Sequence, residues 1–204
     1  MKPSDAVSCA TFPCSDVRTD VHLVPALEID PAGIKIIMIS EAPPSDPAAY
    51  FYAPGDPFYL KTTMQAFGDA GVGVRTMQDI TALGIYLTTA IKCAKTRYAI
   101  APETMRNCSS LLEKEISLFP NASVFLLMGD TAVRTMNYMA VRQWGTRVIP
   151  AGSTYKIRTQ KFYHGGRRFF PSYVQTGGNY LIEKRKREMI AEDLKEALRV
   201  IRAI

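Results

Sequence analysis

The chain has 204 residues, of which 47% are hydrophobic and 22% charged, a composition that suits one globular domain and excludes a disordered chain. No apolar run reaches the roughly 18 residues of a membrane-spanning helix. The amino-terminal residues lack the apolar centre of a signal peptide. We therefore expect a single domain over residues 1–204, located in the cytoplasm and without a membrane partner.

The net charge of +6 is unevenly distributed along the chain. Residues 1–150 carry 13 Lys and Arg against 14 Asp and Glu, whereas residues 151–204 carry 12 against 5. This basic quarter includes Lys161, Arg167, Arg168 and the run KRKR at 184–187. It is either a surface that attracts the phosphates of a nucleic acid or a solvated basic face.

The first 33 residues show little periodicity and are interpreted as an irregular arm. Residues 34–44, IKIIMISEAPP, follow with the pattern of a buried parallel strand that ends at Ser-Glu and two prolines. Ligands of open parallel sheets bind beyond the carboxyl ends of the strands, so Glu41 is expected at a crevice. The next loop is rich in proline and aromatic residues.

The remaining elements alternate between helices and strands. Helices are expected at 61–70, 76–83, 101–119 and 130–139, strands at 84–91 and 123–128, a short strand from Arg168 that ends at Pro171, and a long amphipathic helix at 179–204. The turn at 129–131 suits an anion, although capping of the helix by Asp130 or Thr131 is the simpler interpretation. The alternation predicts an α/β fold: a three-layer αβα sandwich around a mainly parallel sheet of about four strands.

The chain has four cysteines: Cys9 and Cys14 in the arm, Cys93 at a strand end and Cys108 in the following helix. A cytoplasmic protein is not expected to form disulfides. Four thiolates suit a zinc ion or an iron–sulfur cluster, which would fasten the arm. They are equally consistent with four separate buried hydrophobic residues and no metal.

Several stretches together resemble the iron–sulfur (family 4) uracil-DNA glycosylases. The family's Gly-Glu-Ala-Pro-Gly motif is similar to residues 40–44 (SEAPP), its Gly-Arg-Pro-Phe segment to 55–58 (GDPF) and its Asn-Val-Val-Lys-Cys strand end to 89–93 (TAIKC). Its Leu-Gly-x-Thr-Ala segment is similar to 128–132 (MGDTA) and its His-Pro-Ser-Tyr motif to 170–173 (FPSY). The cysteines also follow the family's order.

The resemblance implies a structural [4Fe-4S] cluster on the four cysteines and a pocket for a base flipped out of DNA. Phe58 would stack on the base, Glu41 would line the pocket and Asp46 would orient the attacking water. The other residues implied to bind the base are Ser40, Ala42, Thr89, Phe170 and Ser172. Lys161, Arg167 and Arg168 would contact the DNA backbone of a single- or double-stranded substrate, bound by a monomer.

The chain departs from the family at chemically important positions. Thr89 stands where the family has the Asn that reads uracil, and Phe170 stands where it has the His that donates to the leaving base. His164, six residues earlier, is the candidate replacement donor, and Arg167 or Arg168 could also serve as donors. Two functions therefore remain: a glycosylase for uracil or another altered base, or a weak or inactive relative that binds nucleic acid. A hydrolase built on Glu41 and Asp130 has only fold analogy behind it.

Overall fold

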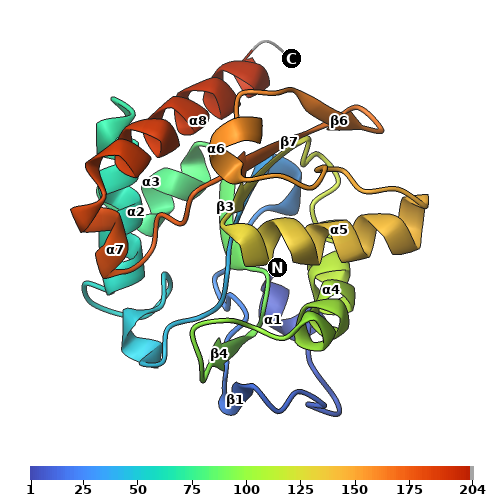
Figure 1. Ribbon diagram of the computed structural model, residues 1–204. Coiled ribbons are helices and arrows are strands. Elements are labelled where there is room, and N and C mark those ends of the chain that lie inside the picture. Colours follow the sequence, from blue (N-terminus) through green and yellow to red (C-terminus); the bar gives the residue numbers. More distant parts are fainter. Residues whose placement is uncertain (203–204) are drawn as a thin grey trace.

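A five-stranded sheet forms the centre of the computed structural model, which describes residues 1–202 (Figure 1). Its strand order is β3-β2-β5-β7-β6. The bounds are β2 Ile36–Ser40, β3 Ile85–Thr89, β5 Val124–Met128, β6 Phe162–His164 and β7 Arg167–Ser172. The first four strands of this order are parallel, and β6 pairs antiparallel with β7. The predicted α/β class and mainly parallel sheet are confirmed, with β6 as a fifth strand.

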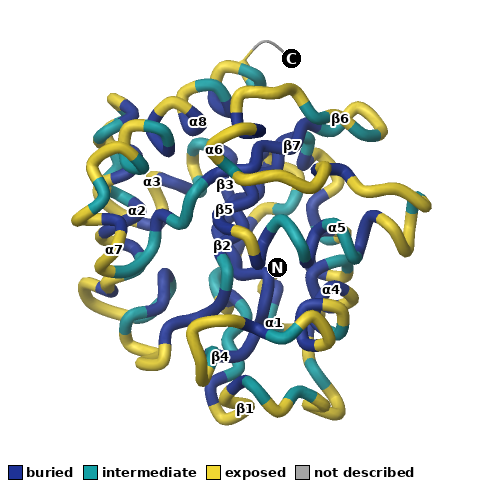
Figure 2. Tube along the Cα trace, in the orientation of Figure 1, coloured by how far each residue is buried: buried dark blue, intermediate teal, exposed yellow. Residues whose placement is uncertain are grey.

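Helices cover both faces of the sheet and complete the three layers. The helices α2 (Phe58–Asp69), α3 (Met77–Ala82) and α8 (Lys184–Arg202) pack on one face, while α4 (Pro102–Ser117) and α5 (Asp130–Trp144) pack on the other (Figure 1). Consecutive residues of β2 point to opposite faces, so Ile36 and Met38 join one core cluster and Ile37 and Ile39 join the other. The strands β2, β3 and β5 are accordingly buried along their length (Figure 2).

The amino-terminal arm is more regular than the sequence predicted. It contains a short helix, α1 (Pro3–Ala6), and a strand, β1 (Val17–His22), which pairs antiparallel with β4 (Cys93–Lys95). The backbone nitrogen of Leu23 also donates to the carbonyl of Lys92 at 2.7 Å. Backbone hydrogen bonds therefore hold the arm against the strand end that carries Cys93. The prediction of an arm without secondary structure was wrong here.

Two element boundaries also differ from the sequence prediction. β7 continues through Pro171 rather than ending there, because β6 pairs only with Arg167–Phe169 and leaves that side of Pro171 without a strand partner. The closing helix is broken at Glu183 into α7 (Gly178–Ile182) and α8. Its last two expected residues, 203–204, lie outside the described residues.

The short elements are α6 (Thr154–Ile157) and the 3₁₀ turns η1 (Pro31–Gly33) and η2 (Pro47–Ala49). Across residues 1–202, no helix combines the length and the apolar character that crossing a membrane requires.

Candidate functional site

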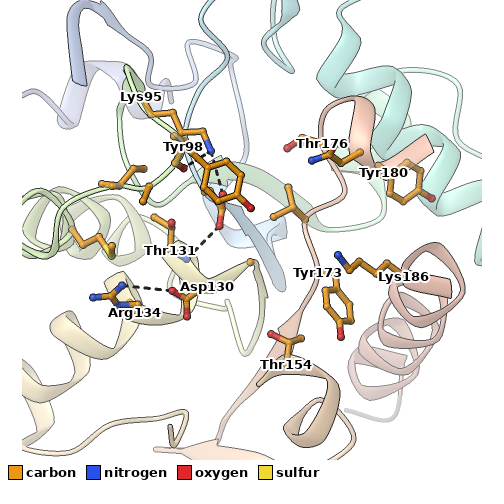
Figure 3. A pocket seen from close by; sticks show the side chains of 18 of the residues that line it. Lys95, Tyr98, Asp130, Thr131, Arg134, Thr154, Tyr173, Thr176, Tyr180 and Lys186 are labelled. Carbon is orange, nitrogen blue, oxygen red and sulfur yellow. Dashed lines mark hydrogen bonds and ion pairs between the residues drawn. The ribbon is translucent and has the colours of Figure 1, made fainter. Parts of the chain in front are cut away.

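A cavity of about 490 Å³ opens beside the carboxyl ends of β2 and β5 (Figure 3). We call it the Glu41 cavity. Glu41 and Ala42 enter it directly after β2, Gly129 and Asp130 after β5, and Tyr173 after β7. The cavity therefore lies where ligands of parallel α/β sheets usually bind, as the position of Glu41 in the sequence predicted.

The Glu41 carboxylate is held between a helix end and a lysine. Its Oε1 accepts a hydrogen bond from the backbone nitrogen of Thr131 at 3.4 Å, and its Oε2 lies 3.6 Å from the Nζ of Lys95. The amino end of α5 carries a partial positive charge, which interacts favourably with a carboxylate. About a quarter of the Glu41 side chain remains exposed. The carboxylate is thus both fixed in place and accessible from the cavity.

Gly129 leaves the room that this carboxylate needs. A Cβ atom at Gly129 would lie 2.8 Å from the Oε1 of Glu41 and 2.5 Å from the Cγ2 of Val174, and its φ of +101° also disfavours other residues. Neither Asp130 nor Thr131 caps α5 through its side chain, in contrast to the sequence interpretation. The carboxylate of Glu41, from another strand, lies at that helix end instead.

Every carboxylate that lines the Glu41 cavity faces a cation that lines it too. Besides the Glu41–Lys95 pair, Asp130 lies 3.6 Å from Arg134 and Glu183 lies 2.5 Å from Lys186. These pairs come from different elements around the cavity (Figure 3). The site therefore offers both proton acceptors and positively charged donors to a polar ligand.

Tyrosine rings supply the flat surfaces of the Glu41 cavity. The lining tyrosines are Tyr59, Tyr98, Tyr173 and Tyr180. Burial raises the pKa of Tyr59, and the nearby Glu41 raises it further, although contact with Thr176 opposes the shift. Tyr59 therefore stays protonated, with its ring and hydroxyl close to the Glu41 carboxylate.

Comparison with known proteins identifies the family of this chain. The profile of the uracil DNA glycosylase superfamily matches residues 28–196. The chain belongs to the uracil DNA glycosylase superfamily. A type-5 uracil-DNA glycosylase of Thermus thermophilus is 31% identical over 124 residues, which cover 60% of this chain and 53% of that relative. The chain thus spans about half the length of this relative, whose type differs from the family-4 resemblance.

Superfamily motif residues fall into two groups in the structure. Glu41 and Ala42 line the cavity, whereas the remaining predicted base-binding residues do not. Phe58, the first residue of α2, is 39% exposed outside the cavity, although its neighbour Tyr59 lines it. The stacking role that the family resemblance implied for Phe58 stays a prediction, while Tyr59 is the member of this pair that lines the Glu41 cavity.

The other base-binding candidates are buried. Ser40 donates to the Oε1 of Gln175 at 3.1 Å, and Ser172 donates to Asp193 at 2.5 Å. Phe170 packs in the core on the α2 and α8 side of the sheet. The hydroxyl of Thr89 is buried without a hydrogen-bond partner among the described residues. These four predicted base-binding residues therefore do not line the Glu41 cavity.

Candidates for the water-orienting and replacement-donor roles lie outside the Glu41 cavity. Asp46 is exposed and caps η2 through a 3.0 Å bond from the nitrogen of Ala48. His164 stacks on Trp144, with ring centroids 4.3 Å apart, at the β6–β7 hairpin. Neither residue contacts the Glu41 carboxylate.

The three predicted DNA-backbone residues cluster at the same hairpin, also outside the cavity. Arg168 is buried and donates to the carbonyls of Gln160, Phe162 and Phe169. Arg167 lies over the ring of Phe125, 6.0 Å from its centroid, and Lys161 is exposed. The guanidinium of Arg168 is thus engaged within the fold, because sequence alone does not distinguish a surface arginine from one that bonds to backbone carbonyls.

The four cysteines gather at the junction of the arm, β4 and α4. Cys14, Cys93 and Cys108 belong to one apolar cluster. Burial, together with the proximity of Cys108, Cys9 and Cys14, raises the pKa of Cys93 to about 12. Within residues 1–202, however, no three Cys, His, Asp or Glu side chains adopt an arrangement that could hold a metal ion. The donors are of the right kind and in one region, without the geometry of a formed site.

Proposed function

We propose that this member of the superfamily is a DNA glycosylase that hydrolyses the N-glycosidic bond of uracil or another altered base. The observation that carries the proposal is the Glu41 carboxylate, fixed by Thr131 and Lys95 at the wall of an open cavity. A carboxylate in this position can orient water and accept its proton. The superfamily membership of residues 28–196 supports the choice of a base in DNA as the substrate.

In the proposed reaction, water replaces the base at C1′ of the sugar. The oxygen of the water bonds to C1′ of the sugar while the bond from C1′ to the base nitrogen breaks. One proton of the water passes to Glu41 and is returned to the departing base. Glu41 serves this role better than Asp46, whose Oδ1 is occupied in capping η2.

Negative charge develops on a carbonyl oxygen of the departing base, and a nearby donor lowers the barrier. Phe170 has no donor, and His164 is stacked on Trp144. Lys95 lines the Glu41 cavity and brings an ammonium group to its wall. We propose Lys95 as the donor to the departing base, and Tyr59 rather than Phe58 as the ring on which the base stacks.

The test uses oligonucleotides, single-stranded and duplex, that carry uracil, hypoxanthine or another altered base, followed by alkaline cleavage at abasic sites. We expect cleavage by the native chain and a loss of roughly a hundredfold or more in Glu41→Gln, as for removal of a principal catalytic group. Glu103→Gln is the matched control, because Glu103 is exposed in the first turn of α4 and lies outside the Glu41 cavity. Equal rates for both variants would refute the role of Glu41.

A second function is favoured by one specific observation. Thr89 and Phe170, which stand at the superfamily's two base-contacting positions, are buried and do not line the Glu41 cavity. A chain without those donors can bind nucleic acid through the cavity without cleaving the glycosidic bond. The absence of abasic sites with every substrate, together with salt-dependent DNA binding, would select this second function.

We also propose that Cys9, Cys14, Cys93 and Cys108 hold a structural [4Fe-4S] cluster, as in the iron–sulfur members of the superfamily. Three of the cysteines share one apolar cluster, and the arm that carries Cys9 and Cys14 lies on β4 beside Cys93. Thiolate ligands would tie the arm to α4 through Cys108. Anaerobically purified protein should contain iron and sulfide in equal amounts and lose thermal stability in Cys93→Ala. Protein containing only zinc, or no metal, would refute the cluster.

A further inference from the structure

A second cavity, of about 400 Å³, adjoins the Glu41 cavity. The two share three lining residues, Tyr173, Glu183 and Lys186. The second cavity, which we call the Tyr155 cavity, is otherwise lined by Tyr155, Lys184, Arg185 and Met189. Because Tyr173 and Lys186 line both spaces, the two cavities lie side by side, and we refer to them together as the groove; Figure 3 shows these two residues in the Glu41 cavity.

Exposed tyrosine side chains line both cavities. Tyr98, in the Glu41 cavity, is 94% exposed on the loop between β4 and α4, and Tyr155, in the Tyr155 cavity, is 68% exposed on α6. Tyr173 lines both cavities, and the Nζ of Lys186 is 5.4 Å from the centroid of its ring. Exposed aromatic rings interleaved with cations are the usual surface on which successive unpaired bases stack.

The charge of the groove changes from one cavity to the other. The carboxylates of the Glu41 cavity are paired with Lys95, Arg134 and Lys186, so that this end is close to neutral. The Tyr155 cavity adds Lys184 and Arg185, and within residues 1–202 neither of them takes part in an ion pair. The excess positive charge therefore lies in the Tyr155 cavity, next to the Glu41 cavity, where the phosphate of a neighbouring nucleotide would lie.

We infer that the groove binds single-stranded DNA, with the reacting nucleotide beside Glu41 and a neighbouring base on Tyr155. Stacking on an exposed ring requires a base whose face is free, which a paired base inside a duplex does not offer. Lys184 and Arg185 then contact the backbone phosphates of the same strand. This inference rests on the proposed function only for the identity of the reacting nucleotide.

The test therefore uses undamaged DNA and measures binding alone. A fluorescein-labelled thymidine oligonucleotide is titrated with the full chain, and anisotropy is compared with that of a duplex of equal length. We expect tighter binding of the single strand. Tyr155→Ala should weaken that binding by roughly five- to a hundredfold, the range for loss of one stacked base. The matched control is Tyr163→Ala, since Tyr163 is 59% exposed on β6 and lines neither cavity.

The contribution of charge is measured by varying the salt concentration. The double variant Lys184→Gln/Arg185→Gln should lower the slope of log K against log salt by about 1.4, because each phosphate contact contributes about 0.7 with single strands. Lys35→Gln/Lys114→Gln is the control, since both lysines are exposed and lie outside the groove. An unchanged slope in the first double variant would contradict the groove.

Failure of this inference is distinguishable from failure of the proposed function. If altered bases are excised but Tyr155→Ala binds undamaged DNA as tightly as Tyr163→Ala, the proposed binding of DNA in the groove is wrong and the proposed glycosylase activity is supported. If no base is excised but the Tyr155 and charge effects appear, the groove stands and the catalytic proposal is wrong. Equal affinity for the duplex and the single strand would also overturn the strand preference.

Discussion

The Oε1 of Glu41 lies 3.4 Å from the backbone nitrogen of Thr131, joining the end of β2 to the amino end of α5. Gly129 lies directly beside this contact, and a Cβ there would approach the same oxygen to 2.8 Å. The contact therefore depends on a residue that has no side chain of its own. A single methyl group added at Gly129 would perturb the contact between Glu41 and Thr131.

Gly129→Ala should displace the Glu41 carboxylate and abolish most base excision. Backbone strain at a positive φ should also cost about 1 kcal/mol of folding stability. Gly71→Ala is the control, because Gly71 has a φ of +75° and its added Cβ would meet nothing within 4 Å. Thermal unfolding should show the cost of the positive φ in both variants and an additional loss in Gly129→Ala from the contact with Val174, while abasic-site formation should fall only in Gly129→Ala. Full activity in Gly129→Ala would mean that the carboxylate position is unimportant.

The fold was largely predictable because burial leaves a clear pattern in the sequence. The apolar run at Ile34–Ile39 indicated a strand covered on both faces, and its alternate residues do enter separate core clusters. The strand β6 was not predicted, because its three residues Phe162–His164 are only partly buried and carry no period. β6 is defined instead by its antiparallel pairing with β7 across the hairpin.

The site was predictable only in part. The position of Glu41 followed from a strand that ends at a polar residue, but Lys95, Tyr59 and Tyr173 join it through tertiary contacts that no short motif encodes. Phe58 and Tyr59 are adjacent in sequence and differ only in the direction of their side chains around α2. Gly129 is recognisable in the sequence as a glycine between a buried strand and a helix. Its partner in the structure, Glu41, lies far away along the chain.

Tyr59→Ala should weaken the binding of an extruded base by about 1–3 kcal/mol, the cost of losing an aromatic stacking surface. Tyr59 lines the Glu41 cavity, whereas Phe58 does not. Phe58→Ala, an equally large truncation at the adjacent residue, should change the affinity by less than about 0.5 kcal/mol. Affinity for an oligonucleotide with a non-cleavable uracil analogue measures both. A larger effect for Phe58→Ala would restore the assignment made from the sequence motif.

The buried ion pair between Lys92 and Glu115 predicts a strongly non-additive double mutant. Both side chains are fully buried, and Glu115 also accepts hydrogen bonds from Tyr86 at 2.6 Å and Thr88 at 2.9 Å. Glu115→Leu should destabilise the fold by about 3–5 kcal/mol, because it leaves the Lys92 ammonium without its counter-charge. Adding Lys92→Met should recover part of that loss in denaturant unfolding. Additive losses would show that the two charges do not stabilise each other.

Asp193 predicts a pH dependence of stability. It accepts hydrogen bonds from Ser172 and from Arg158, yet burial dominates and raises its pKa from 3.8 to about 6. Between these two values the folded chain binds more protons than the unfolded chain, so this group's contribution to stability is greatest at low pH and is lost as the pH rises towards 6. Two pKa units correspond to about 3 kcal/mol.

Asp193→Asn removes this titration while keeping the side-chain size, and Arg158 retains its ion pair with Glu192 at 2.8 Å. The free energy of unfolding of the native chain, minus that of the variant, should therefore fall by about 2 kcal/mol between pH 4 and pH 6 and become constant above about pH 7. Glu188→Gln, at an exposed position of α8, should leave the native profile unchanged. If the difference instead rises over that range, the ion pair with Arg158 outweighs burial, and the pKa of Asp193 lies below its ordinary value.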